Sequence, residues 1–202
     1  MRAKPVGLLV VCLLVAAAVQ AADCTQTGNL VSNCGFDTDL SDWAIGAADS
    51  SAHIPDDGGF ALGSAELDRH DGINAIEIIS SCIEVAQDTS YNVGVAFRLV
   101  SGSVSSTCTL DIWQYELTAC NDFAPVLSTG FLPTATWSEI FGEILTGTGI
   151  NSITLRLACS SEDSDFIIRL DDFLFGEDLF SPVVFNDGFE AEETLLWTSQ
   201  SP

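Results

Sequence analysis

Thr107-Cys108-Thr109-Leu110-Asp111-Ile112-Trp113-Gln114-Tyr115 alternates between two kinds of side chain. Cys108, Leu110 and Ile112 are apolar, whereas Thr109, Asp111, Trp113 and Tyr115 are polar or aromatic. Successive side chains of a β-strand point to opposite faces of the sheet. The stretch therefore predicts a strand that turns one face to a core and a polar, aromatic face outward.

Further short runs of this kind lie on both sides of the stretch, at residues 75–79, 82–85, 91–100, 137–144, 152–159 and 166–175. Turn-rich pieces such as Asp56-Asp57-Gly58-Gly59 and Thr146-Gly147-Thr148-Gly149 separate them. After residue 21 no apolar stripe of useful length has the helical period. The pattern predicts an all-β chain, an antiparallel β-sandwich or jelly roll that forms one domain over residues 22–176.

Residues 1–21 have the pattern of a cleaved secretion signal. Arg2 and Lys4 precede an apolar run from Val6 to Val19, and small residues close the segment at Val19-Gln20-Ala21. A membrane span is the alternative, but a spanning helix needs about 20 apolar residues and this run has about 14. We therefore expect a secreted protein, extracellular or periplasmic, with no membrane insertion after signal cleavage.

Six cysteines remain after this signal, and an even number in an exported chain predicts up to three disulfides. Cys24 with Cys34 is the first expected pair, because the loop between them is short. The other pairings stay open. A metal-thiolate site is not favoured, because the sequence has no C-x-x-C pair. The six candidates are Cys24, Cys34, Cys82, Cys108, Cys120 and Cys159.

The chain is strongly acidic, with a formal net charge of −23. No lysine follows residue 21, and only Arg69, Arg98, Arg156 and Arg169 carry positive charge there. Phosphate groups are bound by clustered Lys and Arg, so nucleic acid and anionic membranes are not expected partners. The excess of acidic over basic residues favours calcium or neutral molecules as ligands, or a saline habitat. A solubilising acidic surface is the alternative explanation.

A motif occurs twice in the chain. Asn33-Cys34-Gly35-Phe36-Asp37 leads to Trp43, and Asn186-Asp187-Gly188-Phe189-Glu190 leads to Trp197. The second copy lies in an acidic tail, residues 177–202, which is too short for another domain. The tail is the first strand of a truncated repeat, a short recurrent tail of exported bacterial proteins, or a final strand of the same sandwich.

The chain resembles carbohydrate-binding modules of the CenC-like group, families 4, 9 and 22. The resemblance spans roughly residues 28–176. It rests on the segment from Asn29 to Trp43, on the run 91–99 with Trp137, and on the pair Asp171-Asp172. The resemblance implies a jelly roll of two antiparallel sheets with a structural calcium near the chain ends, and sugars bound on a concave sheet face or at loop tips.

Two residues correspond to calcium ligands in this resemblance, Asp37 in the opening motif and Asp171 at the end of the last strand. Calcium binds 6 to 8 oxygens from carboxylates, carbonyls and water, so the chemistry suits these residues. The group usually has Glu at the first position, and the shorter Asp37 would reduce or shift coordination. In the alternative, Asp37 caps a turn and Asp171 is a solvated carboxylate.

The candidate sugar-binding residues are Trp113, Tyr115, Asp111 and Arg98. Aromatic rings offer large contact areas to the C–H patches of a sugar, and the carboxylate and guanidinium would bond its hydroxyls. In the alternative, Trp113 and Tyr115 are half-buried aromatics at the sandwich edge. Trp43 and Trp137 are interpreted as structural.

No enzyme signature was found. His53 and His70 stand alone, and the H-E-x-x-H, G-x-S-x-G, P-loop and S-x-x-K patterns are absent. The sequence therefore predicts a monomeric, non-catalytic module, at most an accessory to glycoside hydrolases. It would be stabilised by calcium and would bind a polysaccharide or cell-surface glycan. The alternatives are a structural or adhesive extracellular surface module without a sugar ligand, and a hydrolase.

Overall fold

The computed structural model describes residues 24–70, 75–102, 106–122, 125–161, 165–177 and 179. The expected signal, residues 1–21, and the second motif copy lie outside these residues. No helix that is long and apolar enough to cross a membrane occurs within the described part of the chain. Its strands are β1 (Trp43–Gly46), β2 (Ser50–His53), β3 (Ala65–Arg69), β4 (Ile76–Ser80), β5 (Ile83–Glu84), β6 (Ser90–Ser101), β7 (Thr107–Tyr115), β8 (Val126–Phe131), β9 (Ser138–Leu145), β10 (Ser152–Ser160) and β11 (Phe166–Gly176).

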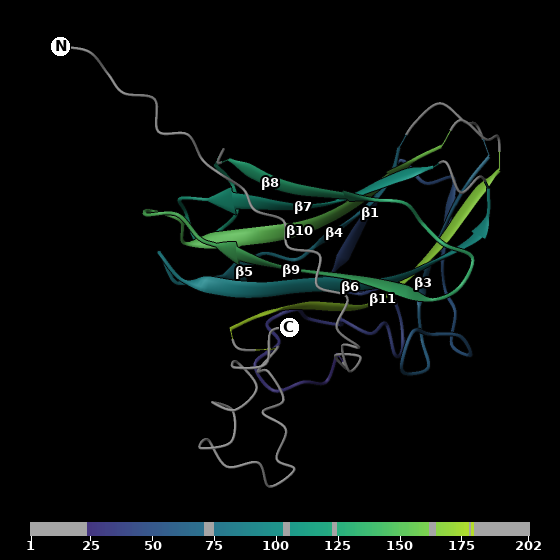
Figure 1. The fold of residues 1–202 in the computed structure, drawn as a ribbon, viewed down its shortest axis with the longest axis horizontal. Coiled ribbons are helices and arrows are strands. Elements are labelled where there is room, and N and C mark those ends of the chain that lie inside the picture. The colour runs from purple at the N-terminus through teal and green to yellow at the C-terminus, as the bar shows by residue number, and fades with distance from the viewer. Residues whose placement is uncertain are drawn as a thin grey trace, which may run out of the picture.

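The strands form two antiparallel sheets packed face to face (Figure 1). Sheet A has the order β1-β4-β10-β7-β8, with β5 paired to β10. Sheet B has the order β2-β3-β11-β6-β9. The expected all-β, antiparallel sandwich is confirmed.

Alternation along the central strands builds the core between the sheets. On β7, Cys108, Leu110 and Ile112 are 2% exposed or less, and Leu155 and Leu157 of β10 are fully buried. Sheet B contributes Val95, Phe97, Ile168, Leu170 and Phe175 to the same cluster. Apolar burial of this extent is the main favourable term in folding.

Four strands were missed by the sequence interpretation: β1, β2, β3 and β8. On β3 the inward positions are Ala65, Leu67 and Arg69, and a fully buried arginine hides the apolar period. Arg69 donates from Nη2 to the carbonyl of Ser161 at 2.7 Å. Strands β1 and β2 are short, and most of β8 is exposed at the edge of sheet A.

The first motif copy fastens the N-terminal segment to the C-terminal half of β11, next to which Figure 1 shows this segment in purple. The Trp43 indole donates to the carbonyl of Asn33 at 3.0 Å. Its ring lies 4.4 Å from that of Phe173 and 5.3 Å from that of Phe36. The backbone N–H of Phe173 donates to Cys34. The motif therefore has a structural role, in agreement with the interpretation of Trp43.

Three disulfides join the described strands and loops. Cys24–Cys34 is the pair expected from the short loop, and it is confirmed. Cys82–Cys120 ties the turn after β4 to the loop after β7. Cys108–Cys159 links residues that lie directly opposite each other on β7 and β10, inside the core.

Candidate functional site

The outer face of sheet A carries the candidate site. Because the apolar positions of β7 point into the core, Asp111, Trp113 and Tyr115 point outward, as the alternation predicted. On β10 the same rule turns Arg156 outward, directly opposite Asp111. Ser128 of β8 lies opposite Asp111 on its other side.

A row of hydrogen-bonded polar side chains runs across four strands of this face. Arg156 donates from Nε to Glu77 Oε2 of β4 at 2.7 Å and from Nη1 to Asp111 Oδ2 at 2.8 Å. Ser128 Oγ donates to Asp111 Oδ1 at 2.5 Å. Burial alone would lower the pKa of the Arg156 guanidinium, but its hydrogen bonds with the two carboxylates raise it. These hydrogen bonds fix the row in place. It is named the polar row and consists of Glu77, Arg156, Asp111 and Ser128.

An aromatic ring borders the polar row on one side and small residues border it on the other. The Trp113 ring centroid lies 5.6 Å from the Arg156 guanidinium carbon, which is cation–π contact distance. On the other side, Ala158, Thr109 and Gly130 stand side by side on β10, β7 and β8. A Cβ on Gly130 would have only one neighbour within 4 Å. These three residues form a low floor along the row.

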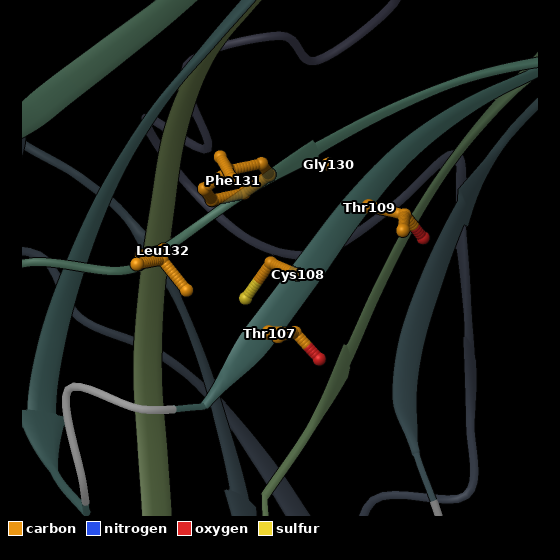
Figure 2. A pocket seen from close by; sticks show the side chains of 6 residues that line it. All are labelled: Thr107, Cys108, Thr109, Gly130, Phe131 and Leu132. Atoms are coloured by element: carbon orange, nitrogen blue, oxygen red, sulfur yellow. The ribbon is translucent and has the colours of Figure 1, made fainter.

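A hollow of about 270 Å³ continues this floor at the β7–β8 edge. Figure 2 shows the hydroxyls of Thr107 and Thr109 on one side of β7 and the Cys108 sulfur on the other. The exposed lining of the hollow is mostly apolar. It is lined by Thr107, Cys108, Thr109, Gly130, Phe131 and Leu132.

Tyr115 shares this face but lies at its closed end. Its hydroxyl is 3.2 Å from Thr154 Oγ1, and 9% of the residue is exposed. The loop after β7 packs against β10 here, where Ser152 Oγ donates to the carbonyl of Leu117 at 2.5 Å. Cys120 of this loop is held by the disulfide to Cys82. Tyr115 is therefore less accessible than Trp113.

Arg98 lies on β6 and faces outward from sheet B, so the structure does not bring it together with the other three candidates. It pairs with Asp57, and its guanidinium carbon lies 5.4 Å from the Trp137 ring centroid. Asp57 also pairs with Arg169 and accepts from Trp137 Nε1 at 3.2 Å. Burial would raise the pKa of Asp57, but the hydrogen bonds from Arg169 and Trp137 lower it below its ordinary value. The cluster ties the loop before β3 to sheet B.

The candidate ligands Asp37 and Asp171 border the same loop, residues 58–63. A Cβ on Gly58 would lie 2.6 Å from the carbonyl oxygen of Gly63 and 2.7 Å from Asp171 Oδ2. A Cβ on Gly63, whose φ is +120°, would lie 2.6 Å from the carbonyl oxygen of Phe36 and 3.0 Å from the Asp37 Cα. The Gly63 carbonyl and the Asp171 carboxylate thus both lie next to Gly58, and the Phe36 carbonyl borders the same loop at Gly63.

Asp171 itself is fully buried at a bulge of β11. Its Oδ2 accepts from the Gly59 N–H at 2.7 Å. Burial and the neighbouring Asp172 raise its pKa to about 8. The same two causes raise the pKa of Glu139, on β9, to about 7. Within the described residues, no group of three or more His, Cys, Asp or Glu side chains is placed to hold a metal.

Sequence reasoning missed Arg156, Glu77 and Ser128 as site residues. The outward position of Arg156 could have been predicted, since it lies between the apolar Leu155 and Leu157 and must point away from the core. Glu77 has the same signal between Ile76 and Ile78. Ser128 has none, because β8 shows no alternation.

No protein-family model matches the chain, and no curated protein matches it. Solved structures do match. The enzymatically active domain of tailspike protein 4 from bacteriophage CBA120 is 14% identical with a TM-score of 0.61, over 73% of this chain and 21% of that one. This chain thus spans about a fifth of the tailspike chain.

Two carbohydrate-binding modules match over almost their whole length. A family 61 module, solved with β-1,4-galactotriose, is 14% identical with a TM-score of 0.54, over 73% of this chain and 97% of that one. A family 16 module is 12% identical with a TM-score of 0.57, over 74% of this chain and 100% of that one. The likenesses establish that the fold is the jelly roll of carbohydrate-binding modules.

Proposed function

We propose that the protein is a secreted, non-catalytic carbohydrate-binding module that holds a polysaccharide on the outer face of sheet A. The polar row carries this proposal, because it places carboxylate, guanidinium and hydroxyl groups across four neighbouring strands. The floor of Ala158, Thr109 and Gly130 leaves space along the row for a chain of sugar rings. The fold shared with modules of families 16 and 61 supports the proposal.

The chemistry of the row suits neutral hydroxyl groups. Arg156 is already bonded to two carboxylates, so the described residues of this face offer no free positive charge to an anionic ligand. The remaining lone pairs and N–H groups would bond sugar hydroxyls, while Trp113 would cover a C–H patch. Each contact is small, and binding energies of about −4 to −7 kcal/mol are expected, from millimolar to about ten micromolar affinity.

Trp113→Ala should weaken retention of the oxidised protein by its polysaccharide at least tenfold. The ring would no longer cover sugar C–H surface, and a tenfold loss corresponds to about 1.4 kcal/mol. Affinity electrophoresis in gels with soluble β-glucans or xylans measures this directly. Phe60→Ala is the matched control, since Phe60 is an aromatic residue, 47% exposed, on the loop that borders sheet B.

Equal retention of the Trp113→Ala variant and the native protein would contradict binding on sheet A. If no polysaccharide in the panel retains the native protein, the alternative of a structural or adhesive surface module gains support.

We also propose that calcium stabilises the module at the loop 58–63. The chemistry suits a hard cation, because the groups that border the loop are oxygens: the Asp171 carboxylate, the carbonyls of Phe36 and Gly63, and the adjoining Asp37. Bound calcium would supply positive charge beside a buried carboxylate. Asp171 and the carbonyls would hold it, and Asp37 would complete the shell from the exposed side.

Excess calcium should raise the midpoint of thermal unfolding relative to the same protein in chelator, because a ligand of the native state stabilises it by mass action. At a calcium concentration of 100 Kd the gain is about 2.7 kcal/mol. Asp171→Asn should abolish most of the shift, and Glu77→Gln, on the other sheet, should retain it. A shift that survives in Asp171→Asn would place any calcium elsewhere.

A further inference from the structure

Strand β8 is an exposed edge without charge. It pairs only with β7 among the described strands. Its residues Val126-Leu127-Ser128-Thr129-Gly130-Phe131 include no charged side chain, although the chain carries −23. Val126 is 43% exposed and Leu127 is 37% exposed. Proteins usually protect such edges with charges, proline or very short strands, because an open edge pairs with other strands.

The other sheet edges are protected in these ways. Strand β9, the edge of sheet B next to β6, carries Glu139 and Glu143. The opposite edges are β1 and β2, which have 4 residues each. Strand β8 is therefore the one described edge that is both long enough to pair and free of charge.

The backbone of β8 is oriented for pairing. The N–H of Gln114 on β7 donates to the carbonyl of Pro125, so the backbone groups of Pro125, and of every second residue after it, face β7. The N–H and C=O groups of Val126, Ser128 and Gly130 consequently face the free edge. None of these three is proline, so each offers one donor and one acceptor.

We propose that two copies of the chain associate through β8, forming an antiparallel pair of edge strands about a two-fold axis. Centring the pair on Ser128 places Val126 opposite Gly130 of the partner subunit and satisfies all of the outward N–H and C=O groups. A Cβ on Gly130 would have one neighbouring atom within 4 Å, so the face has room at this position for the side chain of Val126 from the other copy. This dimer is proposed in place of the monomer expected from the sequence.

A second copy is the occupant that the charge favours. Any copy brings the same uncharged strand, so no charge is desolvated at the strand pair. The two-fold axis also joins the polar rows end to end, because Ser128 is the last member of the row on β8. Repulsion between two strongly acidic chains opposes the pairing, and salt screens this repulsion, with a Debye length of about 10 Å at 0.1 M and about 3 Å at 1 M.

Sedimentation velocity of the oxidised full chain without signal tests the proposal, with no sugar present, so the result does not depend on the proposed function. The dimer fraction should rise with protein concentration and with NaCl from about 0.1 to about 1 M. Leu127→Lys/Thr129→Lys sets lysines opposite each other across the axis and should raise the dimer dissociation constant at least tenfold. Leu145→Lys, at a residue 65% exposed on β9, is the matched control and should dimerise like the native chain.

Gly130→Pro removes an edge N–H that does not face β7, so it should also weaken the dimer while the thermal midpoint stays close to that of the native chain. A native chain that stays monomeric at every concentration and salt level overturns the proposal. Dimers that persist in both edge variants, or that are lost in Leu145→Lys, would place the contact on another surface and overturn it equally.

Discussion

Removing the disulfide in the core should destabilise the module more than removing either of the other two. Cys108 and Cys159 are fully buried and stand 51 residues apart. In the chain-entropy account, a cross-link over this separation stabilises by about 4 kcal/mol. Cys108→Ala/Cys159→Ala also removes two sulfur atoms from a packed core, which adds a cavity cost.

The other two disulfides serve as controls for these two contributions. Cys82–Cys120 spans 38 residues, so its chain-entropy contribution is again about 4 kcal/mol, but Cys82 is exposed and its replacement leaves little cavity. Cys24–Cys34 spans 10 residues and should contribute about 3 kcal/mol. Urea unfolding of the three double alanine variants measures the order. If Cys82→Ala/Cys120→Ala costs as much as the core variant, the cavity cost at Cys108 and Cys159 is absent.

Alternation predicted the central strands well, because these strands have one face in the core and one outside. Both β7 and β10 show this pattern, and so do the inward residues of β6. The same signal failed where an inward position is polar, as at Arg69, and where the strand is exposed, as in β8. Edge strands pack on one side only, so their sequences are less constrained.

The site could be predicted only in part, for a different reason. Alternation placed Asp111 and Trp113 on one face, but it cannot show which strands lie side by side. Arg98 was predicted to bind sugar together with the residues of β7, yet it lies on β6, and β6 and β7 belong to different sheets. The partner of Asp111 is Arg156, about 45 residues later, across a sheet pairing that non-local packing decides.

In the calcium-free protein, the free energy of unfolding should fall as the pH rises from about 5 to about 8.5. Burial and the neighbouring Asp172 raise the pKa of Asp171 to about 8 and that of Glu139 to about 7. Both carboxyls titrate near pH 4 in an unfolded chain. Between these values the folded state binds more protons than the unfolded state, so stability decreases with rising pH.

Asp171 and Glu139 have raised pKa values, which separates them from Asp57, whose pKa is lowered. Their contribution is fully present below about pH 4 and is lost as the pH rises through the folded pKa values. Asp57 has a lowered pKa, so its contribution is present at neutral pH and is lost only as the pH falls below the ordinary range. His70 has a pKa raised by its hydrogen bond with Asp165 and by Asp68, and it titrates on the exposed surface.

Asp171→Asn should therefore flatten the pH profile. Asparagine keeps an oxygen that can accept from the Gly59 N–H, but it takes up no proton on folding. The native slope is at most about 1.4 kcal/mol per pH unit for each group that is protonated only when folded. Urea unfolding in chelator at a series of pH values measures it, and His70→Gln controls for the exposed histidine. A slope unchanged in Asp171→Asn would assign the pH dependence to other groups. A shallower profile, with the slope from Glu139 remaining, together with lost calcium stabilisation would identify Asp171 as the carboxylate that binds a proton or a cation at the loop 58–63.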